Sequence, residues 1–186
     1  MVSSIREQRK YLIEGMSTTE RHMQILAEIE FSIRSQFRSE LLSGRYKLTQ
    51  EQQDLVYNGK NEVRDYKLID CSVVQIIPHI NDLSFVAPDL MLFTSNPYIQ
   101  NDNKTKYAGC PNLIVEVWSK SNREDDIEFK KYLYASGKNT EHWYIEHNSD
   151  IVECCYEDRV IAKVSFSQIL VTSGGISIDL SPLALS

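Results

Sequence analysis

Two acidic residues lie in or beside apolar runs, where a charge is costly unless another group compensates it. Glu116 lies inside the run Leu113-Ile-Val-Glu-Val117, and Asp89 follows Pro88 and precedes the run Leu90-Met-Leu-Phe93. A charge in a core needs a cation, a metal or a hydrogen-bond network around it. Two carboxylates that enter a core from neighbouring strands repel each other unless a divalent cation lies between them. The pair therefore predicts a site for a hard metal with oxygen ligands, Mg²⁺ or Mn²⁺.

Glu116 must be positioned by a strand. Residues 112–118 are predicted to form a buried strand, and residues 142–145 a second one. Alternation along the first strand places Ile114, Glu116 and Trp118 on one of its faces. Any partner of Glu116 must therefore approach that face.

A helix between these two strands can supply such a partner. It is predicted from about Ser121 to Ser136, and Ser121-x-x-Glu124 has the spacing of a capping box. Helical geometry places Lys130 inside the apolar arc of this helix and Lys131 at the edge of the arc. A lysine in a buried arc requires an anion nearby.

A long amphipathic helix is predicted earlier in the chain, from Ser17 to about Ser43. Ser17-x-x-Glu20 has the spacing of a capping box, and Gly44 can end the helix. Its apolar stripe is formed by residues at helical spacing: His22, Leu26, Ile29, Ile33, Phe37 and Leu41. Glu30 falls at the margin of this stripe and is either a distal acid of the site or a solvated glutamate. His22 is interpreted as a core or helix-entry histidine.

The remaining segments predict a sheet packed by helices. Strands are expected within residues 66–77 and 85–93, with an exposed loop at 96–110. A hairpin is expected over residues 151–166, and a last strand at 176–180. This order predicts an α/β or α+β fold. We expect one domain over residues 1–186, in which residues 1–16 form a loosely held lead-in.

Composition excludes several classes of protein. The chain has 186 residues, 42% of them hydrophobic and 25% charged, as in ordinary soluble domains. It has no run of about 20 apolar residues and does not begin with a signal-peptide pattern, so we expect a cytoplasmic protein without membrane contact. The net charge of −6 argues against a broad positive field for nucleic acid. Any DNA binding must therefore use a local basic patch.

Four short motifs occur in a characteristic order: Pro88-Asp89, Glu116-Val-Trp-Ser119, Asp126-x-x-x-Lys130-x-x-x-Tyr134 and Glu141-x-Trp143. In this order and spacing the chain resembles the Uma family, whose members are predicted nucleases of the PD-(D/E)xK superfamily. The resemblance runs from about Val86 to Ile145 and extends more weakly to the first helix and the last strand. It implies a restriction-endonuclease-like fold, a mixed central sheet flanked by helices, and DNA as the substrate.

The resemblance also implies roles for individual residues. Asp89 and Glu116, with the backbone carbonyl of Val117, would bind the divalent metal, which lowers the pKa of a bound water. In the plain superfamily motif a lysine lies two residues after the acid. This chain has Trp118 at that position.

The replacement of the motif lysine matters because an indole ring cannot stabilise developing negative charge. Lys130 can supply the missing ammonium, since its place in the helix arc agrees with the family pattern. Lys120 and Lys131 are alternatives. We expect Lys130→Ala to nearly abolish cleavage and to leave folding almost intact.

Two functions remain open from the sequence. The first is a metal-dependent endonuclease that hydrolyses DNA phosphodiester bonds, with Asp89 and Glu116 as ligands, Lys130 as electrostatic stabiliser and Glu30 as a distal acid. The second is a catalytically weak or inactive nuclease-fold module that binds nucleic acid or a protein partner, which Trp118 and the acidic balance favour. A homodimer is expected in either case, because the superfamily often pairs subunits on two DNA strands.

Overall fold

The computed structural model describes residues 18–42, 67–70, 73–76, 86–93, 98–99, 106–137 and 139–184. The predicted lead-in at residues 1–16, the first capping serine Ser17 and the predicted helix stop at Gly44 lie outside these residues. Within the described part, none of the helices is long and apolar enough to cross a membrane.

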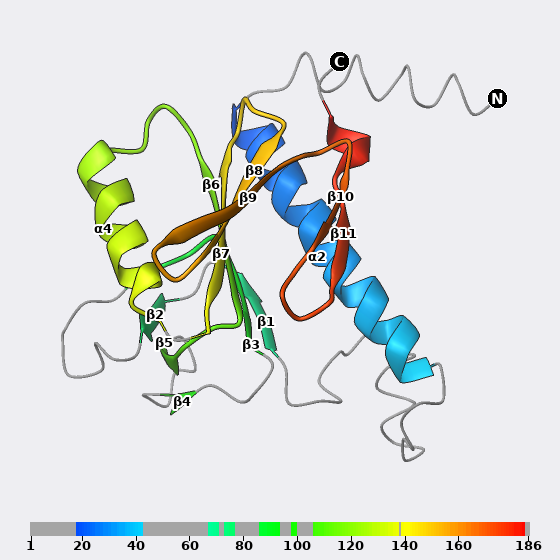
Figure 1. The fold of residues 1–186 in the computed structure, drawn as a ribbon, viewed down its shortest axis with the longest axis horizontal. Helices are drawn as coiled ribbons and strands as arrows, with labels where there is room; N and C mark the ends of the chain where they lie inside the picture. The colour runs from blue at the N-terminus through cyan, green and yellow to red at the C-terminus, as the bar shows by residue number, and fades with distance from the viewer. Residues whose placement is uncertain are drawn as a thin grey trace.

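A six-stranded mixed sheet forms the centre of the fold (Figure 1). Its order is β1-β3-β6-β7-β8-β9. The strands are β1 (Lys67–Asp70), β3 (Leu90–Phe93), β6 (Leu113–Trp118), β7 (Glu141–Glu146), β8 (Ile151–Tyr156) and β9 (Arg159–Ser165). β6 and β7 are parallel, whereas the other neighbouring pairs are antiparallel. The predicted mixed sheet flanked by helices is confirmed.

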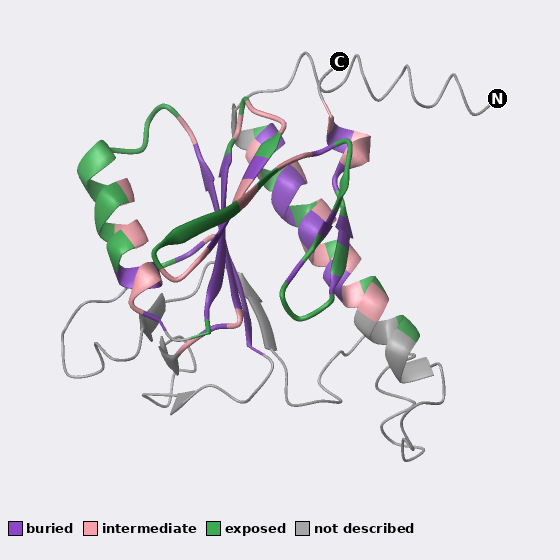
Figure 2. Ribbon diagram, in the orientation of Figure 1, coloured by how far each residue is buried: buried purple, intermediate pink, exposed green. Residues whose placement is uncertain are grey.

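Helices α2 (Thr18–Leu42) and α4 (Glu124–Ala135) cover opposite faces of this sheet (Figure 1). β6 is buried along its whole length, as its nearly continuous apolar sequence requires for a central strand with both faces covered (Figure 2). α4 connects the parallel strands β6 and β7, because parallel neighbours need a crossover. The strand–helix–strand unit predicted around Glu116 is therefore present.

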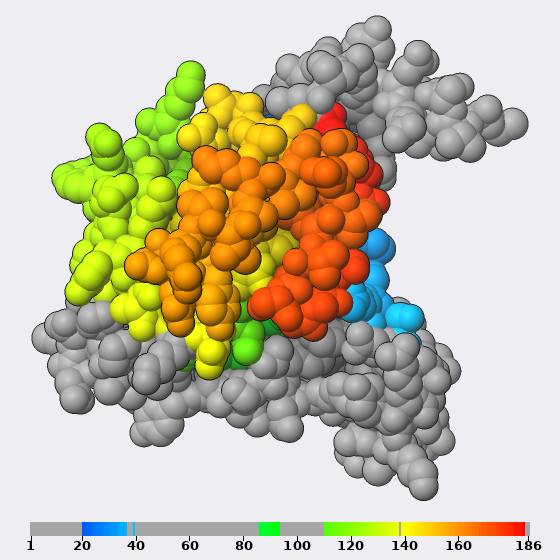
Figure 3. All heavy atoms as spheres, in the orientation of Figure 1, coloured from blue at the N-terminus to red at the C-terminus, as the bar shows by residue number. Residues whose placement is uncertain are grey.

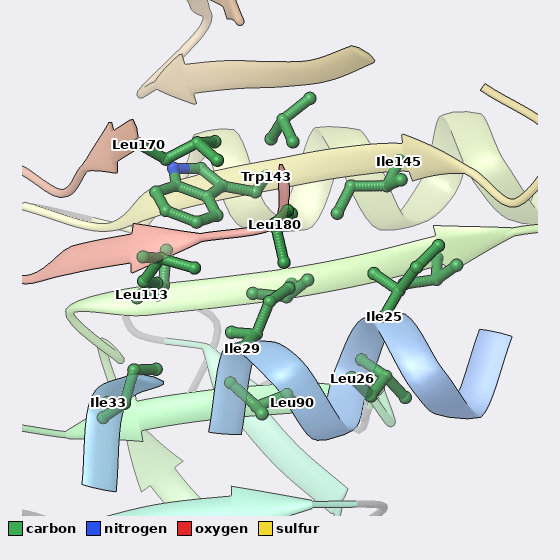
Figure 4. Packing of buried hydrophobic residues seen from close by; sticks show 14 of the residues in the cluster. Ile25, Leu26, Ile29, Ile33, Leu90, Leu113, Trp143, Ile145, Leu170 and Leu180 are labelled. Atoms are coloured by element: carbon green, nitrogen blue, oxygen red, sulfur yellow. The ribbon is translucent and has the colours of Figure 1, made fainter. Parts of the chain in front are cut away.

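The face under α2 holds the larger core. Ile25, Ile29 and Ile33 recur at helical spacing and are fully buried against the sheet (Figure 4). The sheet contributes alternate residues, including Leu113 and Trp143. The short hairpin β10 (Ile169–Val171) and β11 (Ser177–Asp179) closes this core through Leu170 and Ile178.

The face under α4 holds the smaller core. It contains Ile114 and Trp118 of β6, Tyr144 of β7, and Leu133 and Tyr134 of α4. Because side chains alternate along a strand, Glu116 lies on this same face, between Ile114 and Trp118. The acid therefore faces α4.

The start of α4 corrects one expectation. The N-cap is Arg123, which makes no side-chain capping bond, so Ser121-x-x-Glu124 is not a capping box. Ser121 instead shares a hydrogen bond with the Ser119 hydroxyl. The three acids Glu124, Asp125 and Asp126 in the first turn favour the helix start through the helix dipole.

A second correction concerns residues 96–110, which the sequence predicts as an exposed loop. This stretch contains β4 (Tyr98–Ile99) and β5 (Lys106–Gly109), and β5 pairs in parallel with β2 (Val73–Ile76). Such short strands carry little alternation, and their pairing with a distant segment is not visible locally. β10, three residues long, escaped prediction for the same reason.

His142 on β7 gives a testable pH dependence of stability. It is buried, its Nδ1 has no hydrogen-bond partner among the described residues, and burial lowers its pKa from 6.5 to about 4. Between these two pH values, His142 is therefore protonated in the unfolded chain but neutral in the folded chain. The free energy of unfolding is therefore highest above pH 6.5, where His142 is neutral in both states. It decreases as the pH falls from 6.5 through about 4, by about 3 kcal/mol in total.

Urea unfolding of the wild type and of His142→Phe between pH 4 and 7 measures this dependence. The wild type is expected to lose stability more steeply on acidification, because phenylalanine has no proton to bind. Parallel curves for the two proteins would show that His142 is not the source of the acid sensitivity.

Candidate active site

Asp89 lies immediately before β3, at the point where β3 separates from β6. β3 and β6 pair with Leu90 opposite Val115, so one further step of this register places Asp89 opposite Glu116. The Val117 backbone N–H donates a 2.8 Å hydrogen bond to Asp89 Oδ2. The carboxylate thus takes the place of a backbone acceptor at the end of the β3–β6 ladder. The two acids predicted from the sequence are brought to one end of adjacent strands.

Glu116 is 1% exposed and is compensated by two residues of α4. Lys130 Nζ donates to both carboxylate oxygens, at 2.8 Å and 2.9 Å, and the Tyr134 hydroxyl donates to Oε1. Lys130 and Tyr134 are one helical turn apart and therefore reach the strand from the same face of α4. The buried charge has the cation and the hydrogen bonds that its burial requires.

Lys130 also holds the segment that carries Asp89. Its Nζ donates to the backbone carbonyl of Ala87 at 3.1 Å. One ammonium therefore joins Glu116 on β6 to the chain two residues before Asp89. The structure places Lys130 on Glu116, as the sequence predicts, and on the backbone of the segment that leads to Asp89.

The electrostatics of the site follow from burial. Burial raises the pKa of Glu116, although the charge and hydrogen bond of Lys130 and the hydroxyl of Tyr134 act in the opposite direction. Burial, followed by the charge of Glu116, raises the pKa of Tyr134 well above its ordinary value. The tyrosine is therefore a neutral donor to the carboxylate.

Trp118, two residues after Glu116 on β6, packs among aromatic rings. Its ring stacks on Tyr144 at a centroid distance of 4.6 Å, and Lys131 Nζ lies 5.2 Å from the centroid of each ring. Lys131 thus covers two aromatic faces as a cation–π partner. Lys120 is exposed in the turn after β6. Of the three lysines considered from the sequence, Lys130 is the one hydrogen-bonded to Glu116.

The helix α2 contributes a different residue from the one considered. Glu30 pairs with Arg34 of the same helix at 2.7 Å, and no interaction between Glu30 and either Asp89 or Glu116 occurs among the described residues. His22 instead lies with its Nε2 3.4 Å from Asp89 Oδ1. Hydrogen bonding to Asp89 raises the pKa of His22 despite partial burial. The signal in the sequence is a histidine on an otherwise apolar stripe, a pattern that favours a core or helix-entry histidine over a contact with Asp89.

The family model described as "Uma2: Putative restriction endonuclease" matches residues 50–181. The chain belongs to this family. The Uma2 match includes β3, β6, α4 and β7, and with them Asp89, Glu116 and Lys130. The match begins at residue 50, after the end of α2, so His22 and Glu30 lie outside the matched residues.

The Uma2 chain also resembles a solved structure, a putative nuclease belonging to DUF820 from Anabaena variabilis. The TM-score is 0.52 at 11% sequence identity, and the alignment covers 81% of this chain and 79% of that chain. At this identity the likeness shows the fold alone. No significant match was found among curated proteins.

The oxygen donors of the Uma2 site fit a hard divalent cation. Within the part of the chain that the structure describes, Glu116 Oε2 accepts one hydrogen bond, from Lys130, which leaves it a lone pair. In an extended strand the N–H and C=O of one residue point to the same side, so the Val117 carbonyl is directed towards Asp89. Within the described ranges no three His, Cys, Asp or Glu side chains gather to hold a metal. The carbonyl and water would complete the coordination of a cation at Asp89 and Glu116.

Proposed function

We propose that this protein is a metal-dependent endonuclease that hydrolyses DNA phosphodiester bonds. The observation that carries the proposal is the hydrogen bond of Lys130 Nζ to Glu116. It supplies the site with a cation, although Trp118 stands where the superfamily motif has its lysine. Membership of the Uma2 family supports a nuclease, and the resemblance to the PD-(D/E)xK superfamily supports the division of roles.

Each residue has a separate role in this proposal. Asp89, Glu116 and the Val117 carbonyl would hold Mg²⁺ or Mn²⁺, which activates water and offsets charge at the phosphate. Lys130 is anchored to Glu116 and to the Ala87 carbonyl, so its charge is held in a fixed position beside Glu116. A fixed ammonium at this place stabilises negative charge that develops on the phosphoryl oxygens. Tyr134 stays neutral and orients the Glu116 carboxylate.

Glu30 is not given a role in this proposal. Its carboxylate is engaged by Arg34 on α2. The solvated-glutamate interpretation of Glu30 is the simpler one, and it matches the half-exposed position of that side chain.

Cleavage of supercoiled plasmid DNA tests the proposal. The purified protein is expected to nick or linearise plasmid with Mg²⁺ or Mn²⁺ present and to stop when a chelator is added. Asp89→Asn, purified in the same way, should lack the activity, which excludes a contaminating nuclease. Metal-dependent DNA binding without cleavage in the wild type would instead support the inactive, DNA-binding module.

We further propose a homodimer, because a cut in both DNA strands needs two sites of opposite polarity. β9 lies at one end of the strand order, and its outer side pairs with no other strand in the described part of the chain. Val160 and Ile161 on this strand are 52% and 58% exposed. The segment of β9, orange in Figure 3, lies on the side of the molecule that faces the viewer. A second copy of β9, antiparallel about a two-fold axis, would cover both side chains and the free backbone groups.

Sedimentation at tens of micromolar protein tests this assembly. The wild type is expected to sediment as a dimer and Ile161→Lys as a monomer. Val171→Lys, at an equally exposed position on β10, should remain dimeric. A monomeric wild type would remove the dimer, and a dimeric Ile161→Lys would remove β9 as its interface.

A further inference from the structure

We propose that His22 is a positioning residue that fixes the orientation of the Asp89 carboxylate. This inference rests on the proposed metal-dependent nuclease function and extends it to α2, which lies outside the residues matched by the family model. His22 Nε2 is 3.4 Å from Asp89 Oδ1, while the Val117 N–H holds Oδ2 at 2.8 Å. The two oxygens are thus held by two different elements.

The carboxylate of Asp89 would otherwise be free to turn. Asp89 lies before the first residue of β3, outside the regular ladder, and is only half-buried. The hydrogen bond from the Val117 N–H fixes Oδ2, but the carboxylate can still rotate about the axis of that hydrogen bond. A second contact, from the α2 face of the sheet, removes this freedom and so reduces the entropy lost when a cation binds.

His22 itself is held in place by its neighbour Arg21. The Arg21 guanidinium donates to the His147 carbonyl at 2.6 Å, to the Leu183 carbonyl at 3.1 Å and to Asp150 Oδ1 at 2.7 Å. Two distant segments, the turn between β7 and β8 and the stretch at Leu183, therefore hold the first turn of α2. On the following turns, Ile25 and Ile29 are fully buried against the sheet. His22 lies between the anchored Arg21 and the buried Ile25 and Ile29, so the backbone that carries its ring has little freedom to move.

The structure favours this role for His22 over a purely structural one. A histidine that only filled the core would be fully buried among apolar side chains, whereas the side chain of His22 is 26% exposed and directed at a carboxylate. Partners that hydrogen-bond a metal ligand typically change metal affinity or activity by about 10-fold to 100-fold when they are removed. An effect of that size is expected here.

Metal titration by calorimetry, with MnCl₂ as the probe and no DNA present, tests the role directly. His22→Leu is expected to weaken Mn²⁺ binding by about 10-fold to 100-fold. His22→Gln should restore most of the affinity, because the Gln Nε2 can donate from nearly the same position as the histidine Nε2. His22→Asn, whose amide is one bond shorter, should not. Met23→Ala is the matched control, since Met23 is the next residue of α2 and is 59% exposed.

The plasmid assay provides a second test, in which cleavage by His22→Leu is measured at increasing Mn²⁺ concentration. Raising the Mn²⁺ concentration should recover cleavage by His22→Leu, because the defect lies in holding the metal ligand. Wild-type protein that binds no Mn²⁺ would refute the proposed function and this inference together. Wild-type protein that binds Mn²⁺ and cleaves DNA, with His22→Leu and His22→Asn equal to it in affinity, would refute the inference alone. If His22→Leu does not fold, the comparison of His22→Gln with His22→Asn decides.

Discussion

Replacing Lys130 with alanine is expected to slow DNA cleavage by about 100-fold to 1000-fold, the usual cost of losing one preorganised charge at a reacting centre. Lys130 is the ammonium that the structure places on Glu116, at 2.8 Å and 2.9 Å from its two oxygens. Trp118 cannot replace it, because its ring is stacked on Tyr144. Single-turnover cleavage of plasmid at saturating Mg²⁺ measures the loss.

The same substitution is also expected to destabilise the metal-free protein. From the sequence alone we expected folding to stay almost intact, but Glu116 is 1% exposed and loses its counter-charge in Lys130→Ala. Removing one partner of a fully buried ion pair typically costs about 3–5 kcal/mol. The loss here should be smaller, because the Lys130 side chain is 26% exposed and Glu116 can take up a proton.

The pH dependence identifies the cause of that destabilisation. Without Lys130 the pKa of folded Glu116 rises further above its unfolded value. The stability gap between wild type and Lys130→Ala should therefore be small in acid and widen as the pH rises above the raised pKa of Glu116 in the folded wild type, because above that pH only the variant still takes up a proton on folding. Urea unfolding at several pH values without metal measures the gap.

Lys131→Ala is the matched control for Lys130→Ala. It removes a lysine from the adjacent position of α4, whose ammonium lies over Trp118 and Tyr144 instead of Glu116. Cleavage should change little. A wild-type rate in Lys130→Ala would show that the catalytic cation is Lys120, or that the site works without a lysine.

Asp89→Asn is expected to abolish measurable cleavage and to weaken Mg²⁺ or Mn²⁺ binding by more than the roughly 100-fold upper effect of an outer-shell partner. The substitution removes the negative charge of a proposed direct ligand but keeps the shape of the side chain. The asparagine oxygen can still accept the hydrogen bond from the Val117 N–H. The thermal unfolding temperature should therefore stay close to that of the wild type.

Asp158→Asn provides the control for the lost charge. Asp158 lies in the turn between β8 and β9, and its side chain is 84% exposed. Its replacement therefore removes one negative charge from the protein without altering the site. Calorimetric metal titration and plasmid cleavage compare the two variants. Unchanged metal affinity in Asp89→Asn would exclude Asp89 as a ligand.

Much of the fold could be predicted because it depends on local patterns. The stripe of isoleucines along α2, the continuous apolar run of β6 and the alternation in β8 each have a period that identifies the element. The ordered motifs identified the family, which the family model confirms. The helix start at Arg123 and the short strand β5 were missed, since capping geometry and distant pairing leave little local trace.

The sequence by itself predicted that Glu116 is an acid in a buried strand, because apolar residues flank it on both sides. It also indicated that Lys130 faces that strand, since helical angles fix the direction of a side chain. Only the tertiary structure decided that α2 brings His22, not Glu30, to Asp89. That choice depends on the position of α2 along the sheet. The contacts of Arg21 with His147, Asp150 and Leu183 help to fix this position. Such a register between distant segments has no counterpart in any local pattern.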